Sequence, residues 1–182
     1  MAGVERTDRA RFLIAIASLL ALIVLLGFLG SRSAGSSHPL HNGDVLGQER
    51  EESFGEYQRR ANATLEGEAE RFALVTFRNS LDPRAASDAL RTVRRVNAIV
   101  VNGFAPLAIP EPTGEEDRAD VITRYQRIAQ FPEAPLDSVV VFERSGTLRE
   151  LSENPKIVAV EALPDGAAWG HFGIKPVRVG AV

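Results

Sequence analysis

The sequence contains no cysteine, and only one tryptophan, one methionine and three histidines among its 182 residues. Without cysteine the chain cannot form disulfides or thiolate metal sites, use a cysteine nucleophile, or carry a lipid on an N-terminal cysteine. The absence does not fix the compartment, because a domain of about 150 residues can bury a sufficient core without disulfides.

The motifs of common catalytic and cofactor sites are also missing. There is no Gly-x-Ser-x-Gly elbow, no phosphate-binding glycine loop and no Ser-x-x-Lys. His38 and His41 form a His-x-x-His pair, but Pro39 and the loop composition favour two solvated side chains over a metal site. A formal net charge of −3 gives no sign of a nucleic-acid-binding patch. The sequence therefore predicts no catalytic residue, cofactor, metal or nucleic-acid partner.

The longest apolar run covers residues 12–30 and has Ser18 as its only polar side chain. As a helix it would extend over about 28 Å, close to the thickness of the hydrocarbon core of a bilayer. A soluble helix of this length would normally carry a polar stripe, and this run has none. We therefore expect a single transmembrane helix at 12–30.

Arginines flank this run unevenly, which predicts its orientation. Arg6, Arg9 and Arg11 precede it, whereas only Arg32 follows closely. The positive-inside rule places residues 1–11 in the cytoplasm and the rest of the chain outside. Because the run exceeds the length of a signal-peptide core and no good cleavage site follows it, an uncleaved anchor is favoured over a cleaved signal.

Residues 31–47 are rich in Ser, Gly, Pro and Asn and are predicted to form a flexible tether. The charged segment 48–66 carries an apolar stripe at helical spacing, formed by Phe54, Tyr57, Ala61 and Leu65. This stripe predicts an amphipathic helix near the membrane. It would pack on the following domain, or alternatively pair with a copy of itself or with another membrane protein.

Residues 67–182 have the pattern of an α+β domain. Strands are expected at 71–77, 97–104, 136–144 and 156–163, where apolar and β-branched residues cluster. Helices are expected from Asp82-Pro83, at 116–130 and within 145–155, with capping boxes suggested by Thr113/Glu116 and Thr147/Glu150. The glycines and Pro176 in 167–179 indicate a last strand at the edge of the sheet.

This element order is β-α-β, helix, β-α-β, β. Two such units in one mostly antiparallel sheet resemble a ferredoxin-like α/β sandwich, with the 116–130 helix inserted between the halves. The resemblance concerns topology alone and implies no function. A different α+β arrangement of the same elements is the alternative.

The candidate partner surface is formed by the residues with the most unusual local chemistry. They are the only tryptophan and its neighbours on the last strand, and the aromatic residues of the membrane-proximal helix: Trp169, His171, Lys175, Phe54 and Tyr57. An exposed Trp on an edge strand would suit strand addition by a partner, whereas a buried one would serve only the core; the core interpretation is favoured.

Arginine greatly outnumbers lysine and alanine is abundant, a composition common in bacterial proteins from GC-rich genomes. Together these features predict a non-enzymatic, single-pass envelope protein whose exported domain binds or scaffolds a protein partner. One alternative is a ligand-binding or sensory domain that has a pocket near the proline-rich loop 105–114 and acts through a membrane partner. A second is an enzyme with an unfamiliar site around His171. A third is a secreted binder, if the N-terminal segment is cleaved.

Overall fold

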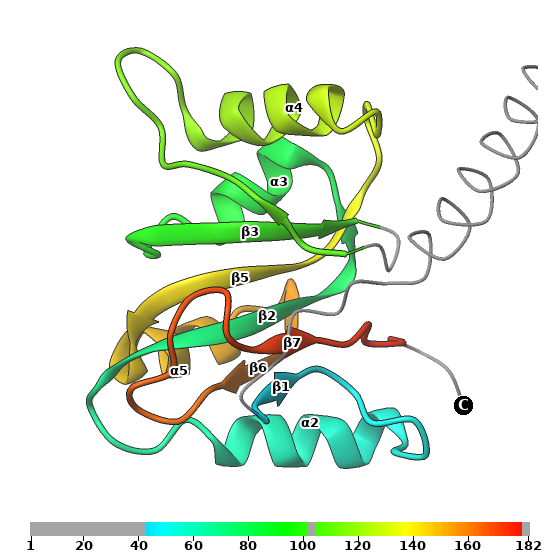
Figure 1. Ribbon diagram of the computed structural model, residues 1–182, viewed down its shortest axis with the longest axis vertical. Helices are drawn as coiled ribbons and strands as arrows, with labels where there is room; N and C mark the ends of the chain where they lie inside the picture. The colour runs from blue at the N-terminus through cyan, green and yellow to red at the C-terminus, as the bar shows by residue number, and fades with distance from the viewer. Residues whose placement is uncertain (1–42, 102–104, 180–182) are drawn as a thin grey trace, which may run out of the picture. The chain divides into compact units, whose positions relative to one another are not determined.

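The computed structural model describes residues 43–101 and 105–179 (Figure 1). The predicted cytoplasmic tail, the apolar run 12–30, both histidines of the His-x-x-His pair and most of the predicted tether lie outside the described residues. The described residues form one compact unit.

A five-stranded sheet is the centre of this unit. Its strands are β2 (Glu70–Leu81), β3 (Arg95–Val101), β4 (Leu107–Ala108), β5 (Leu136–Arg144) and β6 (Ile157–Ala162). They lie in the order β4-β3-β5-β2-β6, and every neighbouring pair is antiparallel. The predicted α+β class with a mostly antiparallel sheet is therefore confirmed.

Four helices are present among the described residues: α2 (Phe54–Ala63), α3 (Pro83–Ala89), α4 (Arg118–Ile128) and α5 (Ser145–Ser152). Helix α3 begins as the sequence predicts, because the Asp82 side chain accepts a hydrogen bond from the N–H of Ala85 and Pro83 occupies the first turn.

Two of the predicted helix caps are wrong. Helix α4 is capped by Asp117 and Asp120, which form a reciprocal capping box, rather than by Thr113 and Glu116. Helix α5 follows β5 without a loop and has no side-chain cap, so Thr147 lies inside the helix. In both segments a Thr and a Glu three residues apart match the capping-box pattern, but neither pair caps the helix.

The main core lies between one face of the sheet and helices α3, α4 and α5. Alternate residues of β2 (Ala73, Val75 and Phe77) point into it and are almost completely buried. Figure 1 shows α5 behind the sheet, and α4 and α3 stacked beside β3. Phe72 and Leu74, which alternate with them, point to the opposite face.

The opposite face of the sheet is covered by the two ends of the described chain. Strand β1 (Val45–Leu46) pairs in parallel with β7 (Gly173–Ile174), and both lie in front of the main sheet in Figure 1. They bury a second apolar cluster: Leu46, Phe72, Leu74, Ala98, Val140, Leu163 and Phe172. Since Leu46 is 1% exposed, the end of the predicted tether is already part of the folded unit.

The predicted last strand is therefore corrected. It covers two residues rather than the whole of 167–179, and it lies on a face of the main sheet instead of at its edge. Gly170 has a φ of +82° and turns the chain before β7, and Phe172 is then buried in the second cluster.

Candidate functional site

The five residues predicted as a partner surface do not form one surface. Trp169 lies in a turn, is 43% exposed, and packs against Phe72 and Phe172 with ring centroids 5.6 Å and 5.8 Å away. His171 is exposed in the same turn. The favoured interpretation of Trp169 as a core residue is therefore only half correct, because one side of the ring is open to solvent.

The other three residues lie at α2 and the chain ends. Phe54 is half-buried and Tyr57 is fully buried, and both pack with Val158 of β6. Lys175 forms an ion pair with Glu49 at 2.6 Å. Tyr57 is thus removed from the predicted surface, since a fully buried ring presents nothing to a partner.

Among the described residues the main sheet ends in β6 on one side and in the two-residue β4 on the other, and backbone groups beside both are occupied. At β6, Gln58 of α2 donates to the carbonyl of Val158 (2.7 Å), and the N–H of Ala162 donates to the Thr64 hydroxyl (2.7 Å). At β3, strand β4 pairs with the middle of the strand, and Glu111 accepts the N–H of Val96 at 2.6 Å. Edges protected in this way resist pairing with another strand.

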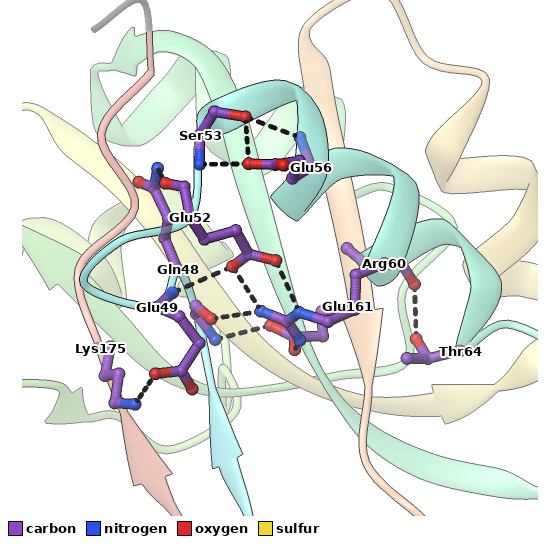
Figure 2. Close-up of polar contacts among 11 residues, drawn as sticks. Gln48, Glu49, Glu52, Ser53, Glu56, Arg60, Thr64, Glu161 and Lys175 are labelled. Carbon is purple, nitrogen blue, oxygen red and sulfur yellow. Dashed lines mark hydrogen bonds and ion pairs between the residues drawn. The ribbon is translucent and has the colours of Figure 1, made fainter.

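An ion-pair network around the buried Glu161 joins the first described residues to the domain, and it was not predicted from the sequence (Figure 2). We call it the Glu161 clasp; it consists of Gly47, Glu52, Arg60 and Glu161. Glu161 lies on β6, is 3% exposed, and accepts a hydrogen bond from the N–H of Gly47 at 2.6 Å. It also accepts a hydrogen bond from Nη1 of Arg60.

Arg60 is the centre of the clasp because it reaches three partners at once. Its Nε and Nη2 donate to the two oxygens of Glu52 at 2.8 Å and 3.0 Å, the paired geometry typical of arginine and carboxylate. Its Nη2 also donates to the carbonyl of Gly47 at 2.9 Å, and its guanidinium lies 5.4 Å from the ring centre of Tyr57. Arg60 thereby holds residues 47–52 against α2 and β6.

The two carboxylates of the clasp have pKa values shifted in opposite directions. Burial raises the pKa of Glu161, although the Gly47 N–H and Arg60 partly oppose that shift. The hydrogen bond from Arg60 lowers the pKa of Glu52. Burial also raises the pKa of the Tyr57 hydroxyl, with the nearby Glu161 charge adding to the effect.

These shifts imply opposite dependences of stability on pH. The folded state holds the Glu161 proton more tightly than the unfolded state, so this group's contribution to stability falls as pH rises from the ordinary glutamate pKa through the raised one. The contribution of Glu52 is present above the ordinary pKa and is lost as pH falls through its lowered value. Arg60 connects the two groups.

The C-terminal segment completes the attachment of residues 44–48. Gly173 and Lys175 donate their N–H groups to the carbonyls of Asp44 (3.0 Å) and Leu46 (2.8 Å). Gly47 has a φ of +103°, and a Cβ at this position would lie 2.1 Å from the carbonyl oxygen of Lys175. Only glycine fits here, because both the backbone conformation and the close approach exclude a side chain.

Among residues 43–101 and 105–179, no group of three or more His, Asp or Glu side chains is placed to hold a metal ion. No helix in the same part of the chain is both long and apolar enough to cross a membrane. No protein-family model, curated protein or solved structure matches this chain.

Proposed function

We propose that this chain is a single-pass membrane protein of the bacterial cell envelope. In this proposal residues 12–30 are an uncleaved anchor, residues 1–11 are cytoplasmic, and the folded unit lies outside the cytoplasm and binds or scaffolds a protein partner without catalysing a reaction. The observation that carries the proposal is the 19-residue apolar run at 12–30, preceded by three closely spaced arginines.

The strand order supports a ferredoxin-like sandwich as the finer description of the fold. The segments β2-α3-β3 and β5-α5-β6 are two β-α-β units, and each pair of parallel strands has a strand of the other unit between them, giving β3-β5-β2-β6. The added helices α2 and α4 and the short strands β1, β4 and β7 are extensions of that arrangement. The topology supports a structural platform and by itself favours no reaction.

The Glu161 clasp supports a role in which the position of the domain relative to its anchor matters. Residues 44–52 are held by buried charge, backbone pairing and the close approach at Gly47. A chain that needed only a loose connection to its domain would not require this attachment. The clasp thereby fixes the chain to the domain from Asp44 onward.

The anchor is tested by fractionating bacteria that express the full chain with a C-terminal tag. We expect the tag at full length in the membrane fraction after an alkaline carbonate wash. The double variant Leu20→Arg/Ile23→Arg should leave that fraction, because each charge at a helix centre costs about 3 kcal/mol of insertion free energy. Thr7→Arg, outside the apolar run, is the control and should remain in the membrane.

A soluble tag on a wild-type chain shortened by roughly 30 residues, the length of a cleaved signal segment, would contradict the anchor. The protein would then be a secreted binder.

A further inference from the structure

Aromatic rings and arginines share one exposed area on the sheet face opposite α3 and α5. Trp169 packs on Phe72, whose ring centroid is 4.7 Å from that of the half-buried Phe142. We call this area the Trp169 surface; its residues are Arg94, Arg95, Phe142, Arg144 and Trp169. In Figure 1 the turn that carries Trp169 precedes β7, in front of β2 and β5.

The register of the sheet places the arginines beside these rings. Arg95 of β3 is paired with Phe142 of β5, so their side chains lie on the same face. Arg144 lies two residues further along β5 and therefore on that face as well. Arg95 is exposed, and the Arg144 side chain is 71% exposed.

The exposed carboxylate of Glu70 pairs with two of these cations. One oxygen of Glu70 lies 2.7 Å from Nη2 of Arg94 and 3.5 Å from Nε of Arg144. The neighbouring Glu143 is buried and accepts the backbone N–H groups of Arg94 (2.7 Å) and Arg144 (2.9 Å), which fixes the backbone positions of both arginines. Arg94 and Arg144 thus share the Glu70 carboxylate, and Arg95 is exposed on the same face. Three guanidinium groups stand against two carboxylates, Glu70 and the buried Glu143, so the surface keeps an excess of positive charge.

We infer that the Trp169 surface binds an acidic segment of a partner protein, one that carries carboxylates next to an apolar side chain. The inference rests on the proposed partner-binding function and specifies the chemistry of the partner. A guanidinium matches a carboxylate through two parallel hydrogen bonds and is weakly hydrated, so arginine suits such contacts. Tryptophan and arginine are also the residues that most often dominate binding energy in protein interfaces.

The composition of this surface favours a protein segment over an anionic lipid layer. Glu70 stands between Arg94 and Arg144, where it can also accept an N–H from a peptide backbone, a donor that a layer of phosphodiester head groups lacks. The rings of Phe142 and Trp169 need an apolar contact to become buried.

Trp169 is the only tryptophan in the chain, so its fluorescence reports directly on this surface. The full-length protein in a non-ionic detergent would be titrated with a blocked hexapeptide, Glu-Glu-Phe-Glu-Glu-Phe. We expect a saturable change in emission with a Kd below about 1 mM, weakened by added salt. A peptide with lysine in place of glutamate should cause no saturable change.

The test variant is Arg95→Gln/Arg144→Gln, which should weaken peptide binding about tenfold or more because two charge-assisted contacts are lost. The matched control is Arg59→Gln/Arg127→Gln, which removes the same charge from exposed positions on α2 and α4 and should bind like the wild type. Equal weakening by both variants would show general charge attraction and overturn the inference.

Two further results separate this inference from the proposed function. Detergent micelles doped with phosphatidylglycerol provide the lipid alternative, and a response to them without a response to the peptide would overturn the inference. A photo-crosslinking amino acid at the exposed Ala168 would be tested in cells. A discrete protein adduct without peptide binding would support the proposed function but overturn the inferred acidic partner. The absence of both an adduct and peptide binding would count against both proposals.

Discussion

Replacing Arg60 by methionine is expected to lower the free energy of unfolding by about 3 kcal/mol. Glu161 is 3% exposed. Without Arg60, its carboxylate would lose the cation of the clasp and would retain only the hydrogen bond from the Gly47 N–H within it. An uncompensated buried carboxylate is far more costly than the loss of an exposed ion pair. Methionine keeps most of the length and apolar volume of the arginine stem, so the loss reports mainly on charge.

Urea unfolding of the full-length chain in a non-ionic detergent, followed by circular dichroism, measures this change. Arg59→Met is the control, because Arg59 is the exposed neighbour on the same helix, and it should cost less than about 0.5 kcal/mol. Adding Glu161→Gln to Arg60→Met should recover part of the lost stability. The free energy of unfolding of the double variant should be about 1 kcal/mol or more higher than the two single effects, added together, would give. Strict additivity would contradict the clasp.

Gly47→Ala should lower the free energy of unfolding by about 3 kcal/mol, because the new Cβ is unfavourable in two ways. The φ of +103° is unfavourable for any residue with a Cβ, and the added carbon would lie 2.1 Å from the carbonyl oxygen of Lys175. Part of this cost can be avoided if residues 44–48 detach from β7. We therefore also expect faster hydrogen exchange at the N–H groups of Gly173 and Lys175, which bond to this segment.

Gly43→Ala is the matched control for this substitution. Gly43 has a similar φ of +96°, but nothing lies within 4 Å of a Cβ built there. Its cost should be limited to backbone strain, about 1 kcal/mol, with unchanged exchange at Gly173 and Lys175. Equal effects of the two substitutions would show that the close approach between Gly47 and Lys175 does not hold the chain ends together.

The parts of the fold that depend on local pattern could be predicted from the sequence. The β-branched runs at 136–144 and 156–163 correspond to β5 and β6, and Asp82-Pro83 marks the start of α3. In the predicted stripe of Phe54, Tyr57, Ala61 and Leu65, the last three residues are buried and Phe54 is half-buried, although α2 ends at Ala63, before Leu65. In these segments burial and capping depend on neighbours a few residues away.

The clasp could not be predicted, because its members meet only through the tertiary fold. Arg60 and Glu161 are 101 positions apart. The one available signal was Glu161 itself, a single acid within the otherwise apolar segment 157–163. Its burial requires a partner that the sequence does not identify.

The last strand was mispredicted for a related reason. Its glycines and proline indicate a weak strand, but they do not show whether that strand joins an edge of the main sheet or lies across one face. The aromatic residues that decide this, Phe72 and Phe172, are distant in sequence and meet only in the folded chain.

The absence of cysteine allows the most direct test of the central claim, that the folded unit lies outside the cytoplasm on an N-terminal anchor. Full-length Thr92→Cys and Thr7→Cys variants would be treated, in spheroplasts, with a maleimide reagent that does not cross membranes. Thr92 is exposed on the folded unit, and Thr7 precedes the apolar run. We expect labelling of Thr92→Cys in intact spheroplasts and of Thr7→Cys only after lysis; the reverse pattern would place the domain in the cytoplasm and contradict the claim.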